Sequence, residues 1–137
     1  MTNANYGAMP AVNQPSKVTL WIGRVLSALP VLMLLMSAIM KLMKVPVAVK
    51  GFKHLGWPEH LAVTLGIIEL SCAILYAIPA TSVLGAILVT GYLGGAVATH
   101  FRIGETQAIN AVVLGIVIWL GLFLREPRLR SLIPLRR

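Results

Sequence analysis

Four long apolar segments divide the chain, and polar or charged residues bound each of them. They are Val25–Met40, Leu61–Ile78, Val83–Thr99 and Ala108–Leu124. As helices they extend about 24–27 Å, slightly less than a hydrocarbon core of about 30 Å, and flanking Trp, Lys and Arg side chains can close that gap. A helix in a soluble bundle needs a polar stripe, which these segments lack. The pattern therefore predicts four membrane-spanning helices.

The connections between the segments set the topology. Pro79–Ser82 and His100–Gln107 are short, so consecutive spans are expected to be antiparallel neighbours. The first connection is longer, with Pro46 suited to the first position of a helix and Gly56 suited to a stop. Between them, apolar residues recur every three or four positions opposite a basic side. An ordinary loop is the alternative. The fold class expected is an all-α membrane protein, a four-transmembrane-helix antiparallel bundle with a short amphipathic interfacial helix between spans one and two.

Composition supports a single membrane domain. Hydrophobic residues make up 58% of the 137 positions and charged residues 12%, which leaves too much apolar surface for one small water-soluble core. We expect a disordered N-terminal tail at 1–17, the four-span domain at 18–126 and a basic C-terminal tail at 127–137. The net charge is +8, and the cationic residues behind it flank the apolar runs, as expected for contact with lipid head groups. They form no single soluble patch, so no nucleic-acid partner is expected.

Cationic residues also favour one orientation. An even number of spans puts both termini on one side, where seven Lys and Arg residues lie against five on the other side. Because cytoplasmic segments carry the excess of positive charge, cytoplasmic termini are expected, although the first loop is itself basic.

One span contains an ionisable side chain near its middle. Glu69 shares a helical face with Cys72 and Tyr76, which gives a polar strip in an apolar helix. An intramembrane carboxyl can have a functional role, in which it carries a proton or orients a ligand. The alternative is a structural role, in which it stabilises helix packing by pairing with a cation such as Arg24. Arg24 at the edge of the first span can also simply extend to the head groups.

The third span carries small residues on one side. Gly91 and Gly95 form a GxxxG pair, and Gly94 lies beside them. Small residues let helices approach closely in lipid. These glycines are therefore predicted to act in helix packing, either within the bundle or between two copies of the chain.

The histidines and the catalytic motifs bear on cofactors and catalysis. His100 ends the third span, and a pair with His60 is permitted by the topology, but neither lies deep enough for a buried haem, so no metal site is predicted. No nucleotide-binding loop, metalloprotease motif or nucleophile elbow is present. A stand-alone enzyme is therefore not expected.

Several segments are similar to a known family. They are the first loop with Lys41-Leu42, Pro46, Gly51-Phe52 and Leu55-Gly56-Trp57-Pro58, Glu69 in the second span, the third-span signature Gly91–Arg102 and the tail Leu124–Arg130. Over roughly residues 18–135 the chain resembles the bacterial DoxX-like family. The resemblance implies a small four-span inner-membrane protein with a redox association through a quinol-linked partner. A dithiol mechanism needs two cysteines, and this chain has one.

Two functions follow as hypotheses. The first is an accessory subunit of a membrane redox or quinone-linked system, in which the strip of Glu69, Cys72 and Tyr76 faces the glycines of the third span and forms a pocket for a quinone-like or lipid-like molecule. The alternative is a small-molecule or lipid binding or transport protein that acts as a homo-oligomer, because four short spans make a narrow bundle.

Overall fold

The computed structural model describes residues 14–130 and is all-helical over that range. Its elements in chain order are α1 (Lys17–Leu42), α2 (Pro46–His54), α3 (Leu61–Ala77), a single 3-10 turn (Pro79–Thr81), α4 (Ser82–Arg102), α5 (Ala108–Arg125) and α6 (Pro127–Arg130). The predicted fold class is confirmed, including the short helix between the first two spans. Residues 1–13 and 131–137 lie outside the described residues, so the predicted N-terminal tail and most of the C-terminal tail stay predictions.

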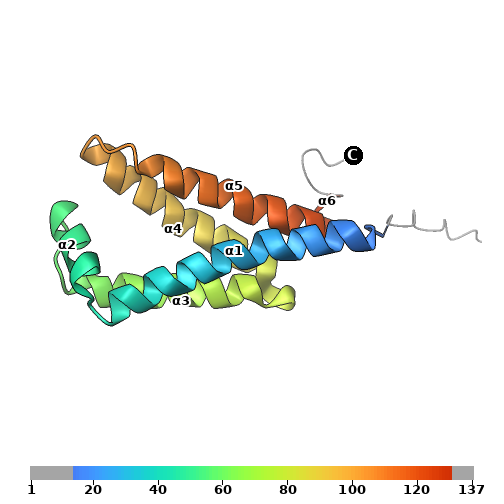
Figure 1. Ribbon diagram of the computed structural model, residues 1–137, viewed down its shortest axis with the longest axis horizontal. Coiled ribbons are helices and arrows are strands. Elements are labelled where there is room, and N and C mark those ends of the chain that lie inside the picture. Colours follow the sequence, from blue (N-terminus) through green and yellow to red (C-terminus); the bar gives the residue numbers. More distant parts are fainter. Residues whose placement is uncertain (1–13, 131–137) are drawn as a thin grey trace, which may run out of the picture.

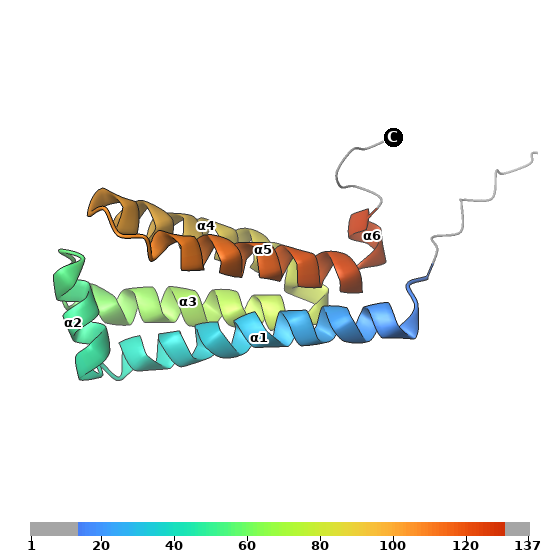
Figure 2. The same cartoon turned by 45° about the horizontal axis from the view of Figure 1, so that its top comes forward.

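The four long helices form an antiparallel bundle (Figure 1, Figure 2). α1 packs against α3 and α5, and α4 packs against the same two helices, so α1 and α4 lie on one diagonal and α3 and α5 on the other. α2 lies across one end of the bundle, and α6 follows α5 at the opposite end (Figure 1). This arrangement leaves one end capped by a helix and the other end near the termini.

Helix length and composition fit a bilayer. Among the described residues, α1, α4 with its preceding turn and α5 are long and apolar enough to span it, and α3 is a shorter apolar helix of 17 residues. As a helix, α3 is about 26 Å long, which slight tilting of its neighbours or local thinning accommodates. Large apolar side chains on the outside include Leu32, Met36, Ile67 and Ile116. A soluble monomer rarely exposes so much apolar surface to water. A surface of this kind is instead suited to contact with lipid chains.

Local sequence determines where the helices begin and end. The Ser16 hydroxyl accepts a hydrogen bond from the Thr19 amide at 3.2 Å and so caps α1. Pro46 occupies the first turn of α2, where its missing N–H costs nothing. Gly56 ends that segment with φ of 72°, a conformation that glycine adopts without strain. Both predicted boundary signals of the short helix are therefore confirmed.

Close helix contacts depend on glycines other than those expected. A Cβ at Gly85 of α4 would collide with the backbone of Tyr76 in α3, and a Cβ at Gly121 of α5 would lie 2.7 Å from the Ser27 hydroxyl oxygen of α1. At Gly91, Gly94 and Gly95 a Cβ would meet nothing within 4 Å. Close packing inside the bundle therefore does not occur at these three positions. Their role between two copies stays a prediction.

The contact at Gly85 gives a test of the fold. We expect Gly85→Ala to lower the stability of the bundle by about 1–3 kcal/mol, because the new methyl group must push α3 and α4 apart. Unfolding can be followed with a thiol-reactive dye, since the single cysteine, Cys72, is buried in the core. Gly94→Ala is the control and should be neutral or stabilising by up to about 1 kcal/mol, as alanine favours the helix. Equal stability of both variants would contradict the close approach at Gly85.

Candidate functional site

Glu69 pairs with a lysine inside the bundle. The Nζ atom of Lys41 lies 2.6 Å from Oε2 of Glu69, and it also donates to the Ser37 hydroxyl at 2.6 Å. The Ser37 hydroxyl in turn donates to Oε2 of Glu69 at 3.2 Å. The Glu69 side chain is 4% exposed and that of Lys41 is 18% exposed. The two charges therefore form a compact network with a hydroxyl that bridges them.

Helix geometry explains why Lys41, and not Arg24, is the partner. A helical side chain tilts toward the N-terminus of its own helix. Because α1 and α3 are antiparallel neighbours, Lys41 tilts back over Ser37 while Glu69 tilts toward the start of α3, so the two side chains converge. Arg24 is exposed near the far end of α1 and tilts away from Glu69. In the sequence Lys41 stands out only as a cation that flanks the first span and opens the family-like first loop, although its spacing of four from Ser37 is a usable signal.

The ion pair borders a cavity of about 550 Å³ that lies between the helices on the side of α2. Most of its lining is apolar, and it includes Phe52 and Trp57 from the α2 segment. Tyr92 of α4 also lines the cavity, and its ring centre lies 5.8 Å from Nζ of Lys41. Further polar groups at the cavity are His100, Gln107 and Asn110. An apolar cavity with a few convergent polar groups is the usual form of a small-molecule site.

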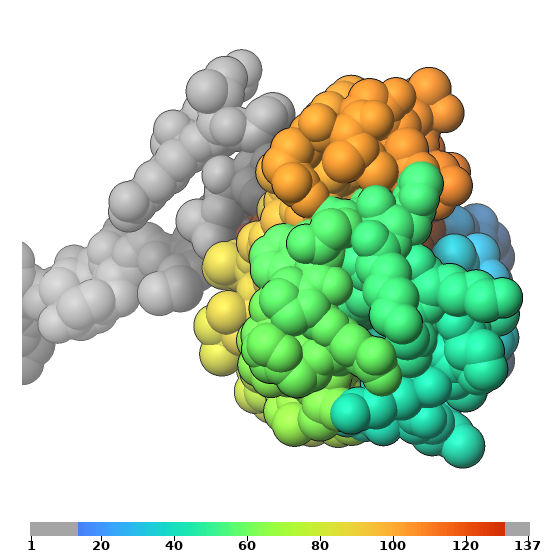
Figure 3. All heavy atoms as spheres, turned by 90° about the vertical axis from the view of Figure 1, so that its left-hand side faces the viewer, coloured from blue at the N-terminus to red at the C-terminus, as the bar shows by residue number. Residues whose placement is uncertain are grey.

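Two contacts fasten α2 over this end of the bundle. His54 at the end of α2 pairs with the Glu105 carboxylate in the turn between α4 and α5, and the Arg102 guanidinium donates to the Leu55 carbonyl. Glu105 also lies 3.8 Å from Nε2 of His100. Figure 3 views this end directly, with the green α2 segment spread beside the orange turn between α4 and α5. The cavity is therefore covered by a short helix that polar contacts hold in place.

The other two members of the predicted polar strip lie away from the cavity. Tyr76 is fully buried, its hydroxyl donates to the Ile118 carbonyl at 2.8 Å, and it lies 3.0 Å from the Ser27 hydroxyl oxygen. The Arg125 guanidinium lies over the Tyr76 ring at 4.8 Å and donates to the Tyr76 carbonyl. Cys72 is buried in the apolar core. The structure thus places Glu69 at the cavity and the other two residues in the packing of the bundle.

The remaining candidate residues divide in a similar way. Gly91 and Gly95 line the cavity together with Glu69, whereas Gly94 lines a different hollow, between α4 and α5. His100 borders the cavity, and its Nδ1 lies 2.8 Å from the Ala96 carbonyl oxygen. His60 is exposed, and among the described residues the hydrogen bond of His100 goes to its own helix and not to His60. Tyr92, Ser37 and Lys41 are site residues that sequence analysis missed.

The fold and the site together define a class: a small four-helix membrane protein with a capped intramembrane cavity. A model of the DoxX-like family matches residues 25–122, which covers all four long helices in large part. The chain therefore belongs to the DoxX-like family, as the sequence resemblance indicated. No curated protein and no solved structure matches it significantly.

The buried pair can be tested by a double-mutant cycle made of Lys41→Met, Glu69→Leu and the double variant. Lys41→Met should cost about 3–5 kcal/mol because it leaves a buried carboxylate without its partner, while the double variant Lys41→Met with Glu69→Leu should recover most of that loss. Unfolding monitored through Cys72 provides the measurement. Lys50→Met, at an exposed position of α2, is the control and should change stability by less than about 0.5 kcal/mol. Additive losses in the double variant would show that the two side chains do not act as a pair.

The attachment of α2 is tested separately. Glu105→Gln removes the carboxylate that faces both histidines, a contact worth about 1 kcal/mol, so amide exchange in Pro46–His54 should become about fivefold faster. Hydrogen exchange with mass spectrometry measures this effect peptide by peptide. Glu126→Gln, at the opposite end of the bundle, should leave exchange in α2 unchanged. Unchanged exchange in the Glu105 variant would mean that α2 is held by its apolar contacts alone.

Proposed function

We propose that this protein binds a neutral amphipathic molecule in the cavity under α2. The observation that carries the proposal is the Lys41–Glu69 pair at the wall of an otherwise largely apolar cavity. An ionisable pair inside a membrane protein is costly, and it marks a functional site more often than a purely structural one. The apolar lining favours a hydrophobic body, and the pair gives that body one polar point of attachment.

The chemistry of the pair further restricts the class of ligand that the cavity can bind. The Lys41 ammonium has three N–H donors, and among the described residues two of them go to Ser37 and Glu69. The third is available to an acceptor in the cavity. Because the two charges cancel, the site has little net attraction for an anion, and a carbonyl oxygen suits it better than a phosphate. Quinones combine a ring, two carbonyl groups and an apolar tail, and so belong to the class expected.

The cellular setting of this binding role is part of the proposal. Quinone binding is consistent with an accessory subunit of a redox system in the bacterial inner membrane, with the termini in the cytoplasm. It is equally consistent with a binding or transport protein that acts alone or as an oligomer. The cavity supports the binding step that both roles share.

Trp57 gives a direct assay, since it lines the cavity. With Trp21→Phe and Trp119→Phe in the background, decyl-ubiquinone added to nanodiscs should quench Trp57 fluorescence saturably. Gly95→Leu should weaken this quenching at least tenfold by filling the cavity, and its Cβ meets no neighbour within 4 Å, so the fold should tolerate it. Gly94→Leu is the matched control on the adjacent surface and should bind as the parent does.

Two outcomes would contradict the proposal. One is quenching that rises linearly with quinone and does not saturate, which indicates partition into the lipid only. The other is equal quenching in the Gly94 and Gly95 variants. Mass spectrometry of molecules extracted from protein purified in mild detergent would identify the natural ligand, and Glu69→Gln should reduce its amount.

A further inference from the structure

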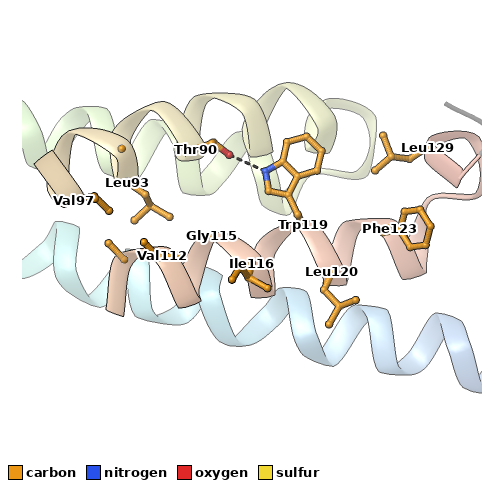
Figure 4. A pocket seen from close by; sticks show the side chains of 12 residues that line it. Thr90, Leu93, Val97, Val112, Gly115, Ile116, Trp119, Leu120, Phe123 and Leu129 are labelled. Carbon is orange, nitrogen blue, oxygen red and sulfur yellow. Dashed lines mark hydrogen bonds between the residues drawn. The ribbon is translucent and has the colours of Figure 1, made fainter. Parts of the chain in front are cut away.

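A second hollow lies on another surface of the bundle, between α4 and α5 (Figure 4). It is a groove of about 580 Å³ that extends from Val97 and Val112 to Phe123 and Leu129. Gly94 and Gly115 keep its floor low, since a Cβ at Gly94 would meet nothing within 4 Å and one at Gly115 only the tip of Leu93 at 3.7 Å. The groove lies along the apolar part of both helices, where lipid chains surround the protein.

The groove offers its occupant no free polar group from the lining side chains. Thr90 is its one hydroxyl, and that group donates to the Ala86 carbonyl at 2.7 Å and accepts from the Trp119 indole at 2.8 Å (Figure 4). Any part of a ligand that lies in the groove is therefore apolar, because a polar group there would lose its hydrogen bonds to water without replacement.

Positive charge gathers where the groove meets the terminal end of the bundle. α6 places Leu129 in the groove wall, and the next residue, Arg130, is held over the Phe123 ring with its guanidinium carbon 5.7 Å from the ring centre. Its Nε and Nη2 atoms donate to the carbonyls of Phe123 and Leu124 at 3.0 Å and 2.8 Å. Arg125, Glu126 and Arg128 belong to the same segment, so its sum of charges is positive.

We propose that the groove between α4 and α5 binds an anionic phospholipid, with an acyl chain along the apolar floor and the phosphate near Arg130. The groove supplies the place for the chain, and the fixed guanidinium supplies the charge that selects an anionic head group. A second copy of this chain fits less well. Two copies inserted with the same orientation would bring their arginine-rich α6 segments to the same membrane face, where like charges repel.

Trp119 is a reporter inside the groove, which makes the proposal directly measurable. In the Trp21→Phe, Trp57→Phe background, nanodiscs of phosphatidylcholine receive increasing amounts of phosphatidylglycerol or phosphatidylcholine with brominated chains. Bromine quenches indole fluorescence on contact. We expect brominated phosphatidylglycerol to reach half-quenching at a mole fraction about fivefold lower than brominated phosphatidylcholine, the change that one arginine near the surface produces.

Variants separate the contribution of the lipid head group to binding from that of the acyl chain. Arg130→Gln should remove the preference for phosphatidylglycerol, and Arg130→Lys should keep most of it, because the charge remains. Arg24→Gln, an exposed cation at the same end of the bundle on α1, should leave the preference unchanged. Gly94→Leu should weaken quenching by both lipids by filling the floor, whereas Gly95→Leu should not.

The proposal is overturned if both brominated lipids quench Trp119 equally in the parent protein. It is also overturned if neither lipid quenches Trp119 and the full chain crosslinks as a dimer through α4 or α5, since a second copy would then fill the groove. Failure here leaves quinone binding at the capped cavity untouched, because that assay reads Trp57 and responds to Gly95 instead of Gly94.

Discussion

A polar side chain inside a bilayer has to find its partner within the protein, because no water is present to replace one. Two buried networks in the described part of the chain show how this constraint is met. At the end near α2, Lys41, Ser37 and Glu69 join α1 to α3. Toward the terminal end, the Tyr76 hydroxyl crosses the core to the Ile118 carbonyl of α5, the helix on the diagonal from α3. These contacts fix which helices are neighbours where apolar packing alone would tolerate alternatives.

The two networks differ in what surrounds them, and this difference separates structure from function. The Tyr76 hydroxyl and carbonyl are hydrogen-bonded, the Arg125 guanidinium lies over its ring, and Gly85 packs against its backbone. The Lys41–Glu69 pair is buried on the protein side and open on the cavity side. A fully enclosed polar group can only stabilise the fold, whereas one that borders a cavity can also contact a ligand.

Much of the fold could be predicted from the sequence, since it depends on local signals. Apolar length gave the spans, and Pro46 with Gly56 gave the short helix, because hydropathy and capping act within a few residues. The polarity of Glu69 was also visible. Its partner was not, since Lys41 lies 28 positions away and looks like an ordinary interfacial cation. Only the tilt of side chains on two antiparallel helices brings them together.

The glycines of α4 show the same limit more sharply. A GxxxG spacing predicts a flat helix surface but not what lies against it. In this bundle the surface borders a cavity at Gly91 and Gly95 and a lipid-facing groove at Gly94, while the close helix contact falls at Gly85. Which glycine meets a backbone depends on the rotation of α4 about its axis, and that is set by Tyr76 and the core.

That rotation has a further consequence, because α4 separates the two hollows. Leu93 of α4 and Ala111 of α5 line both the capped cavity and the outer groove. Side chains in a close-packed wall cannot move toward one space without opening the other. A molecule in the cavity and a lipid chain in the groove would contact opposite sides of the same wall. Each proposed ligand would therefore meet a different glycine of α4, Gly95 in the cavity and Gly94 in the groove, and for this reason the two proposals can be tested with separate variants.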